Sequence, residues 1–90
     1  MLQLREKKVG PYTVRELSMR DTLRILKEYP EASDERNAAM LGASVWNGAD
    51  TPVGPAVLDF GAGVYRALLS AHAEVNRAPT EGEGGEQGNG

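Results

Sequence analysis

The chain has 90 residues, of which 26% are charged and 40% hydrophobic, and its formal net charge is −3. These values are typical of one small soluble domain, and no apolar run approaches the roughly 18 residues that a membrane span needs. The sequence has no cysteine, which excludes a disulfide framework and a thiolate zinc site, and the lack of an export signal predicts a cytoplasmic protein.

Residues 1–17 predict a β-hairpin. Apolar and polar side chains alternate in MLQLREKKVGPYTVREL, and Gly10-Pro11 lies between the two arms. This alternation is typical of strands with one half-buried face. Two strands alone are barely stable in water, so we expect the hairpin to pack against the rest of the domain.

Two short helices are predicted next, over about residues 19–29 and 34–46. Ser18 and Ser33 precede them, and serine is a favoured N-cap because its hydroxyl accepts a hydrogen bond from a free N–H of the first turn. Gly48 supplies a C-terminal stop for the second helix, because glycine adopts the left-handed conformation that often ends helices.

The third predicted helix, residues 55–77, is the longest and the most apolar. Only a thin polar stripe interrupts its apolar circumference, which indicates burial on more than one side. Two short helices and a hairpin cover only part of it, so we expect another copy or another protein to cover the rest. The predicted fold is therefore mainly α with a short hairpin (α+β), one domain over residues 1–77. The glycine- and glutamate-rich residues 78–90 predict a disordered tail.

Two short strings in this last helix are spelled like chemical motifs. Asp59-Phe60-Gly61 matches the metal-binding triplet of kinases, and Gly61-Ala62-Gly63 matches part of a phosphate loop. The chain is far too short for a kinase and lacks the other kinase motifs, and no buried strand precedes the glycines. His72 is the only histidine and has no orienting partner. The sequence thus predicts no enzyme, no cofactor and no metal site.

Glycine is costly inside a helix, by about 1 kcal/mol relative to alanine for each position. The pair at 61 and 63 therefore suggests either close approach of another backbone or a bend. Large amphipathic side chains are enriched at interface hot spots, although they are more often core in a small domain. The candidate partner-binding residues are Trp46, Phe60, Gly61, Gly63, Tyr65 and Leu68.

The charges are unevenly distributed along the chain. Residues 1–27 carry seven bases and three acids, whereas residues 28–77 carry three bases and seven acids. The basic first third allows an alternative interpretation, a small helical regulator that binds DNA. Phosphate binding needs a dense basic stripe, and this one is diluted by acids, so nucleic acid is the weaker interpretation.

Three segments of the sequence resemble the tail assembly chaperones of long-tailed, siphovirus-type bacteriophages. They are YTVRELSMRDTLRILKEYP, ERNAAMLGASVWNGADTPVG and LDFGAGVYRALLSAHAEVN, and together they cover roughly residues 12–76. The similarity lies in the order of elements: an extended arm, a first helix, a second helix that ends at an Asn-Gly-x-x-x-Pro turn, and a last helix.

The resemblance implies a noncatalytic protein of a phage or prophage that acts in the host cytoplasm and is absent from the mature virion. Such chaperones bind the tape measure protein, keep it soluble and help to recruit tail tube subunits. Many are also made in a longer form by ribosomal frameshifting.

Overall fold

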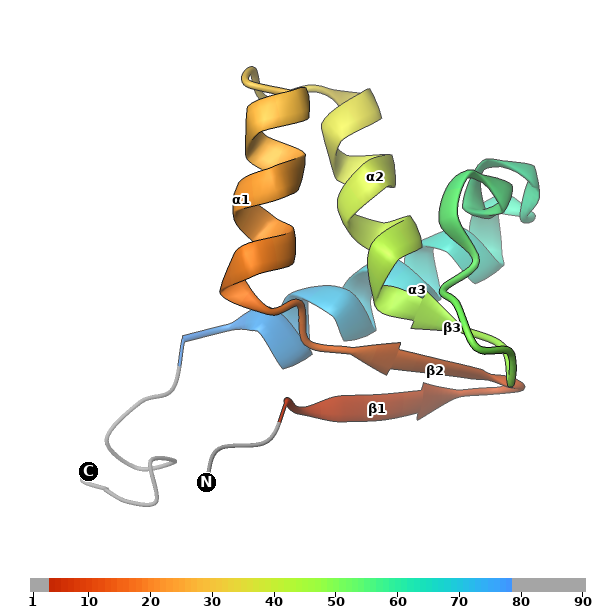
Figure 1. Ribbon diagram of the computed structural model, residues 1–90. Coiled ribbons are helices and arrows are strands. Elements are labelled where there is room, and N and C mark those ends of the chain that lie inside the picture. The colour runs from red at the N-terminus through yellow and green to blue at the C-terminus, as the bar shows by residue number, and fades with distance from the viewer. Residues whose placement is uncertain (1–3, 79–90) are drawn as a thin grey trace.

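The computed structural model describes residues 4–78, and within them a small sheet carries all the helices on one side (Figure 1). The α+β class expected from the sequence is confirmed, with an N-terminal hairpin and a last α-helix that is the longest. The expected disordered tail, apart from Ala78, and the first three residues of the expected hairpin lie outside the described residues.

The hairpin consists of β1 (Glu6–Val9) and β2 (Tyr12–Arg15), which pair antiparallel in a register that sets Lys7 opposite Val14. Gly10 turns the chain between them with φ of +56°, a conformation that glycine adopts without steric cost. The sequence alternation placed this element correctly.

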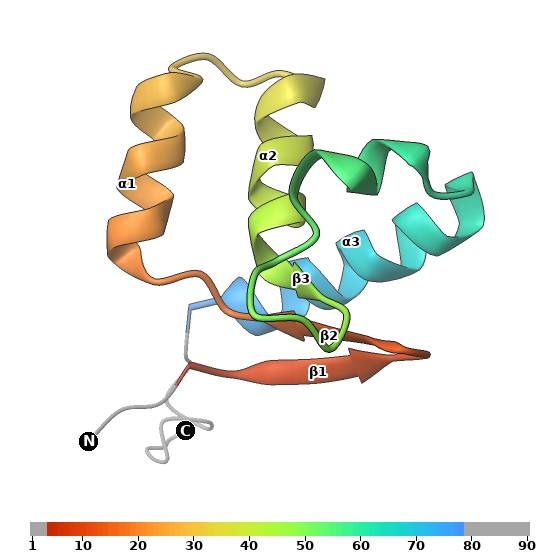
Figure 2. The same ribbon diagram turned by 45° about the vertical axis from the view of Figure 1, so that its right-hand side comes forward.

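Helix α1 (Met19–Glu28) begins as expected, because the Ser18 hydroxyl accepts a hydrogen bond from the Asp21 N–H at 3.1 Å. Helix α2 (Asp34–Ser44) begins in the same way, with the Ser33 hydroxyl accepting from the Arg36 N–H at 3.1 Å. The two helices stand side by side above the sheet (Figures 1 and 2).

The expected end of the second helix at residue 46 is wrong. Helix α2 ends at Ser44, and the next two residues form a short strand, β3 (Val45–Trp46), which pairs antiparallel with β2. Val45 and Trp46 are β-branched and aromatic, the types that favour a strand, and the Ser44 hydroxyl donates to the Arg15 carbonyl beside it. Gly48 has a positive φ, but it turns the loop after β3 and does not cap the helix.

The expected single helix over residues 55–77 is also wrong. The chain forms a 3₁₀ helix, η1 (Gly54–Asp59), breaks at Phe60, and then forms α3 (Ala62–Asn76). Phe60 is extended at the break, and its ring packs on that of Tyr12 with 5.1 Å between centroids. The chain therefore bends at Phe60, directly before Gly61.

Helix α3 crosses the helical side of the sheet and packs against β1 and β2 (Figure 2). Val14 and Val45, paired across the two strands, contribute to the core and are fully buried. The rest of the core comes from α2, η1 and α3, through Leu41, Val57, Leu68, Ala71 and Val75. The sheet, α2, η1 and α3 thus share one core, whereas Ile25, the buried residue of α1, lies outside this cluster.

The end of α3 is tied to the start of α1. The Asn76 side-chain oxygen accepts a hydrogen bond from the Leu17 N–H at 2.9 Å. The Asn76 amide nitrogen donates to the His72 carbonyl at 2.8 Å and lies 3.1 Å from the Nδ1 atom of His72. One side chain therefore satisfies groups of two elements that are 59 residues apart in sequence.

Candidate protein-binding groove

The residues that the sequence singled out for partner binding do not form one surface. Leu68 is fully buried in the core, and Phe60 and Tyr65 are partly buried against it. Trp46 lies on the opposite, helix-free face of the sheet, where the Arg15 guanidinium stacks over its ring at 4.5 Å. Leu68, Phe60 and Tyr65 therefore contribute mainly to the stability of the fold.

Gly61 and Gly63 are exposed, and a Cβ atom added at either one would meet nothing within 4 Å. Within the chain, neither glycine supports the close approach of a backbone. Gly61 is the N-cap of α3 in an extended conformation, and Gly63 lies in its first turn. Of the two explanations suggested by the sequence, the chain itself provides the bend.

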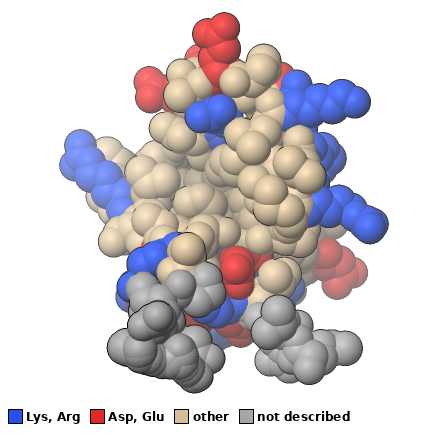
Figure 3. Space-filling view, turned by 90° about the vertical axis from the view of Figure 1, so that its left-hand side faces the viewer, with Lys and Arg blue, Asp and Glu red and all other residues tan. Residues whose placement is uncertain are grey.

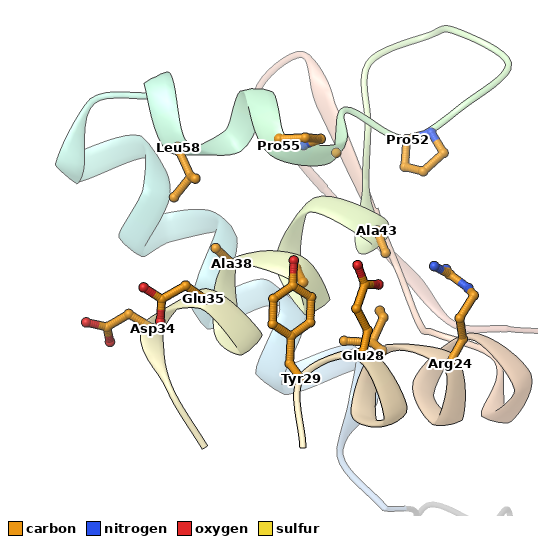
Figure 4. A pocket seen from close by; sticks show the side chains of 13 residues that line it. Arg24, Glu28, Tyr29, Asp34, Glu35, Ala38, Ala43, Pro52, Pro55 and Leu58 are labelled. Atoms are coloured by element: carbon orange, nitrogen blue, oxygen red, sulfur yellow. The ribbon is translucent and has the colours of Figure 1, made fainter. Parts of the chain in front are cut away.

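A groove elsewhere in the molecule has the character of a binding site. It runs between α1, α2 and the segment that contains η1, with a volume of about 460 Å³. Ala38, Ala39 and Ala43 of α2 line it. Figure 4 shows Ala38 and Ala43 between two walls. One wall contains Pro52, Gly54, Pro55 and Leu58. The other contains Arg24, Ile25 and Glu28 of α1 together with Tyr29, the residue that caps the end of this helix.

Close backbone packing at one point positions the wall that contains η1. A Cβ atom at Gly42 would come within 2.8 Å of the Gly54 carbonyl carbon, so only glycine fits there without movement. Gly54 itself has φ of +62°, which turns its carbonyl toward α2. The close approach that the sequence suggested for glycines in the last helix occurs instead at Gly42.

The charged groups along the groove are mostly acidic. Glu28, Asp34 and Glu35 line it together with one base, Arg24, and all four side chains are exposed. The Arg24 guanidinium also lies 3.5 Å from the Asp21 carboxylate. The groove therefore combines an apolar interior with an excess of carboxylates, which favours an apolar segment that carries positive charge beside it.

A second apolar surface lies on α1 and faces away from the core. Met19 is 66% exposed and Leu23 is 55% exposed, and Leu26, on the same side of the helix, is partly buried. Only Ile25 of this helix is fully packed. On the α1 side the molecule presents a broad uncharged area with charges around its edges (Figure 3). We refer to Met19, Leu23 and Leu26 as the α1 stripe.

Sequence reasoning missed the groove and the exposed apolar face of α1, whereas in the segment 55–77, where it expected an uncovered apolar face, Leu58 and Val64 are exposed. Two features of the sequence could have indicated the groove. They are the alanines of NAAMLGAS and the apolar face of α1, which is larger than α2 can cover. Neither feature defines a groove until α1, α2 and η1 are brought together in space.

Several bases of the first third are paired with acids. Arg5 lies 3.6 Å from Glu16, and the ammonium group of Lys7 lies 2.7 Å from the carboxylate of Glu74 on α3. Arg15 similarly lies 3.4 Å from Glu6. These pairs reduce the positive charge that DNA phosphates would meet, so no specific observation favours the DNA-binding alternative.

Two titratable groups among residues 4–78 have pKa values below their ordinary ones. Burial lowers the pKa of His72, and the hydrogen bond from Lys7 lowers the pKa of Glu74. In the same part of the chain, no group of three or more His, Asp or Glu side chains is placed to hold a metal ion.

None of the helices in the described part of the chain is long and apolar enough to cross a membrane. Comparisons with protein-family models, with curated proteins and with solved structures found no match to this chain.

Proposed function

We propose that this protein is a noncatalytic chaperone of bacteriophage tail assembly, which binds an apolar helical segment of the tape measure protein in the groove between α1, α2 and η1. The observation that carries the proposal is the alanine lining of this groove. Small side chains let a second helix approach closely, and an amphipathic helix in an apolar groove is a recurrent mode of peptide recognition.

A resemblance of the sequence supports the choice of the tape measure protein as the partner. The order of elements over residues 12–76 resembles the tail assembly chaperones, and a long helical partner would be insoluble if its apolar faces stayed uncovered. In this proposal the protein acts in the host cytoplasm, helps to recruit tail tube subunits, and leaves before the virion matures.

Co-expression with the tape measure protein of the same phage tests the proposal. We expect the wild-type chain to increase the soluble fraction of the tape measure protein. Ala39→Glu should abolish the increase, because it places a long charged side chain inside the groove, while glutamate remains a good helix former.

Ala73→Glu is the matched control, because Ala73 is an exposed position of α3 outside the groove. A tape measure protein that stays equally insoluble with and without the wild-type chain would refute the function. If Ala39→Glu solubilises it as well as Ala73→Glu does, the function would stand and the groove would be the wrong surface.

A further inference from the structure

The α1 stripe and the groove are both apolar, and the charged residues beside them have opposite sign. The stripe is apolar, and Arg20 and Lys27 border it three residues before and four residues after Leu23, on the same side of the helix. The groove is apolar inside and carries Glu28, Asp34 and Glu35 against the single base Arg24. The two surfaces thus share an apolar character and carry opposite charge beside it.

We propose that the α1 stripe of one copy docks into the groove of a second copy, so that the protein associates head to tail with itself. Both surfaces lie on one chain, so an open assembly of several copies has a free groove at one end and a free stripe at the other. An interface of this heterologous kind builds rings or open filaments and does not stop at a dimer.

A symmetric pairing of two α1 stripes is less favourable. In an antiparallel pair of α1 helices centred between Leu23 and Arg24, Arg20 of one copy would face Lys27 of the other, and both positions are exposed. Like charges brought together across an interface oppose association, whereas the carboxylates at the groove attract the same two bases.

The inference rests on the proposed function only in that both use the groove, which cannot hold two helices at once. The stripe of a second copy therefore covers the groove while no client helix is present, and a client that binds more tightly displaces it. Self-association then protects an apolar site from unspecific contacts before assembly begins.

Complementation between two variants of the full chain tests the docking without any client. Leu23→Glu removes the stripe and leaves the groove, and Ala39→Glu blocks the groove and leaves the stripe. In sedimentation velocity at rising concentration, we expect the wild-type mass to grow beyond twice the 9.7 kDa of one chain. Each variant alone should remain monomeric, and their equimolar mixture should form a dimer and nothing larger.

Leu23 is more than half exposed and Ala39 is partly exposed, so circular dichroism should report both variants as folded. Val64→Glu, at an exposed apolar position of α3 outside both surfaces, should associate as the wild type does. A wild-type chain that stays monomeric would overturn the proposal, as would a mixture of folded variants that stays monomeric. Dimers of Ala39→Glu alone would instead indicate stripe-to-stripe pairing, and dimers of Leu23→Glu alone would indicate groove-to-groove pairing.

Discussion

The backbone contact between Gly42 and Gly54 shows how a single residue can decide the shape of a surface far larger than itself. Where glycine stands, the 52–58 segment reaches α2 and becomes a wall of the groove. Any side chain at residue 42 would push this segment outward, since the atoms it meets are backbone and have no rotamer to change.

We expect Gly42→Ala to lower the free energy of unfolding by about 1–3 kcal/mol, the usual cost of overpacking a well-packed site. Gly63→Ala is the matched control, because a Cβ atom there meets nothing within 4 Å. It should raise the free energy of unfolding by about 0.5–1 kcal/mol, since alanine loses less backbone entropy in a helix. Urea denaturation measures both, and a Gly42→Ala variant as stable as the wild type would argue against the close approach.

The environment of His72 makes stability depend on pH. Burial lowers its pKa in the folded protein below the value of about 6.5 that an unfolded chain has. The unfolded state therefore binds the proton more readily, and the stability held above about pH 6.5 is lost as the pH falls through the folded-state pKa. Protonation at Nδ1 would also remove that atom as an acceptor for the Asn76 amide.

We accordingly expect the melting temperature to fall between pH 7.5 and pH 5.5, and His72→Gln to flatten this dependence, because glutamine does not titrate. Thermal melts monitored by circular dichroism across this range provide the measurement. Equal pH dependence in the two proteins would show that other groups control it.

At the scale of elements, α1 is the α-helix with the least packing. Ile25 is the only buried residue among its ten, whereas α2 and α3 bury four and three residues. Helices in small proteins derive most of their stability from such packing rather than from intrinsic propensity. The Ser18 cap and the hydrogen bond from Leu17 to Asn76 hold its beginning.

We expect amide hydrogen exchange in α1 to be faster than in α2 and α3 at low protein concentration, because local opening exposes little apolar area. Ser18→Ala should speed it further and lower stability by about 1 kcal/mol, the typical value of an N-cap. If α1 docks into a second copy, its protection should also increase with protein concentration. Exchange in α1 as slow as in α3 in the dilute protein would contradict this account.

The elements that the sequence predicted correctly are those set by neighbouring residues. The turn at Gly10 and the serine caps of α1 and α2 depend on contacts within about four residues, and they fall where the sequence places them. Strand β3 has only two residues, and the local preference of Val45 and Trp46 is too short to predict it without knowledge that β2 lies beside them.

The break before α3 was missed for a similar reason. Apolar residues recur across 55–77 with helical spacing, but the Phe60 ring packs on Tyr12, almost fifty positions earlier, and the chain is extended there. The groove depends on three elements at once, so its residues could be identified from the sequence only as an alanine-rich helix and an amphipathic one.

At the scale of the whole molecule, the separation of charge along the sequence becomes a separation between surfaces. Bases border the α1 stripe, and carboxylates gather at the groove. The range of such attraction is about 8–10 Å in physiological salt, so it acts on a copy that is already close and orients it.

We therefore expect self-association to weaken as NaCl is raised from 50 to 500 mM, and Arg20→Glu with Lys27→Glu to weaken it at low salt. Apolar contact alone would give no such decrease, since salt does not screen it. Sedimentation velocity at fixed protein concentration measures the effect. Association that is unchanged or stronger at 500 mM would mean that apolar contact, without charge pairing, joins the copies.

Strand β1 affects how readily the protein aggregates at high concentration. It is an edge strand of the sheet, and the N–H and C=O groups on its outer side are a template to which a strand of another molecule could pair. Three of its four residues are charged, so such an addition would force Glu6, Lys7 and Lys8 of neighbouring molecules together. The other edge strand, β3, has only two residues available for such pairing. Fibrous aggregation through the sheet is thus disfavoured at both edges, which leaves the helices as the surface for the proposed reversible association.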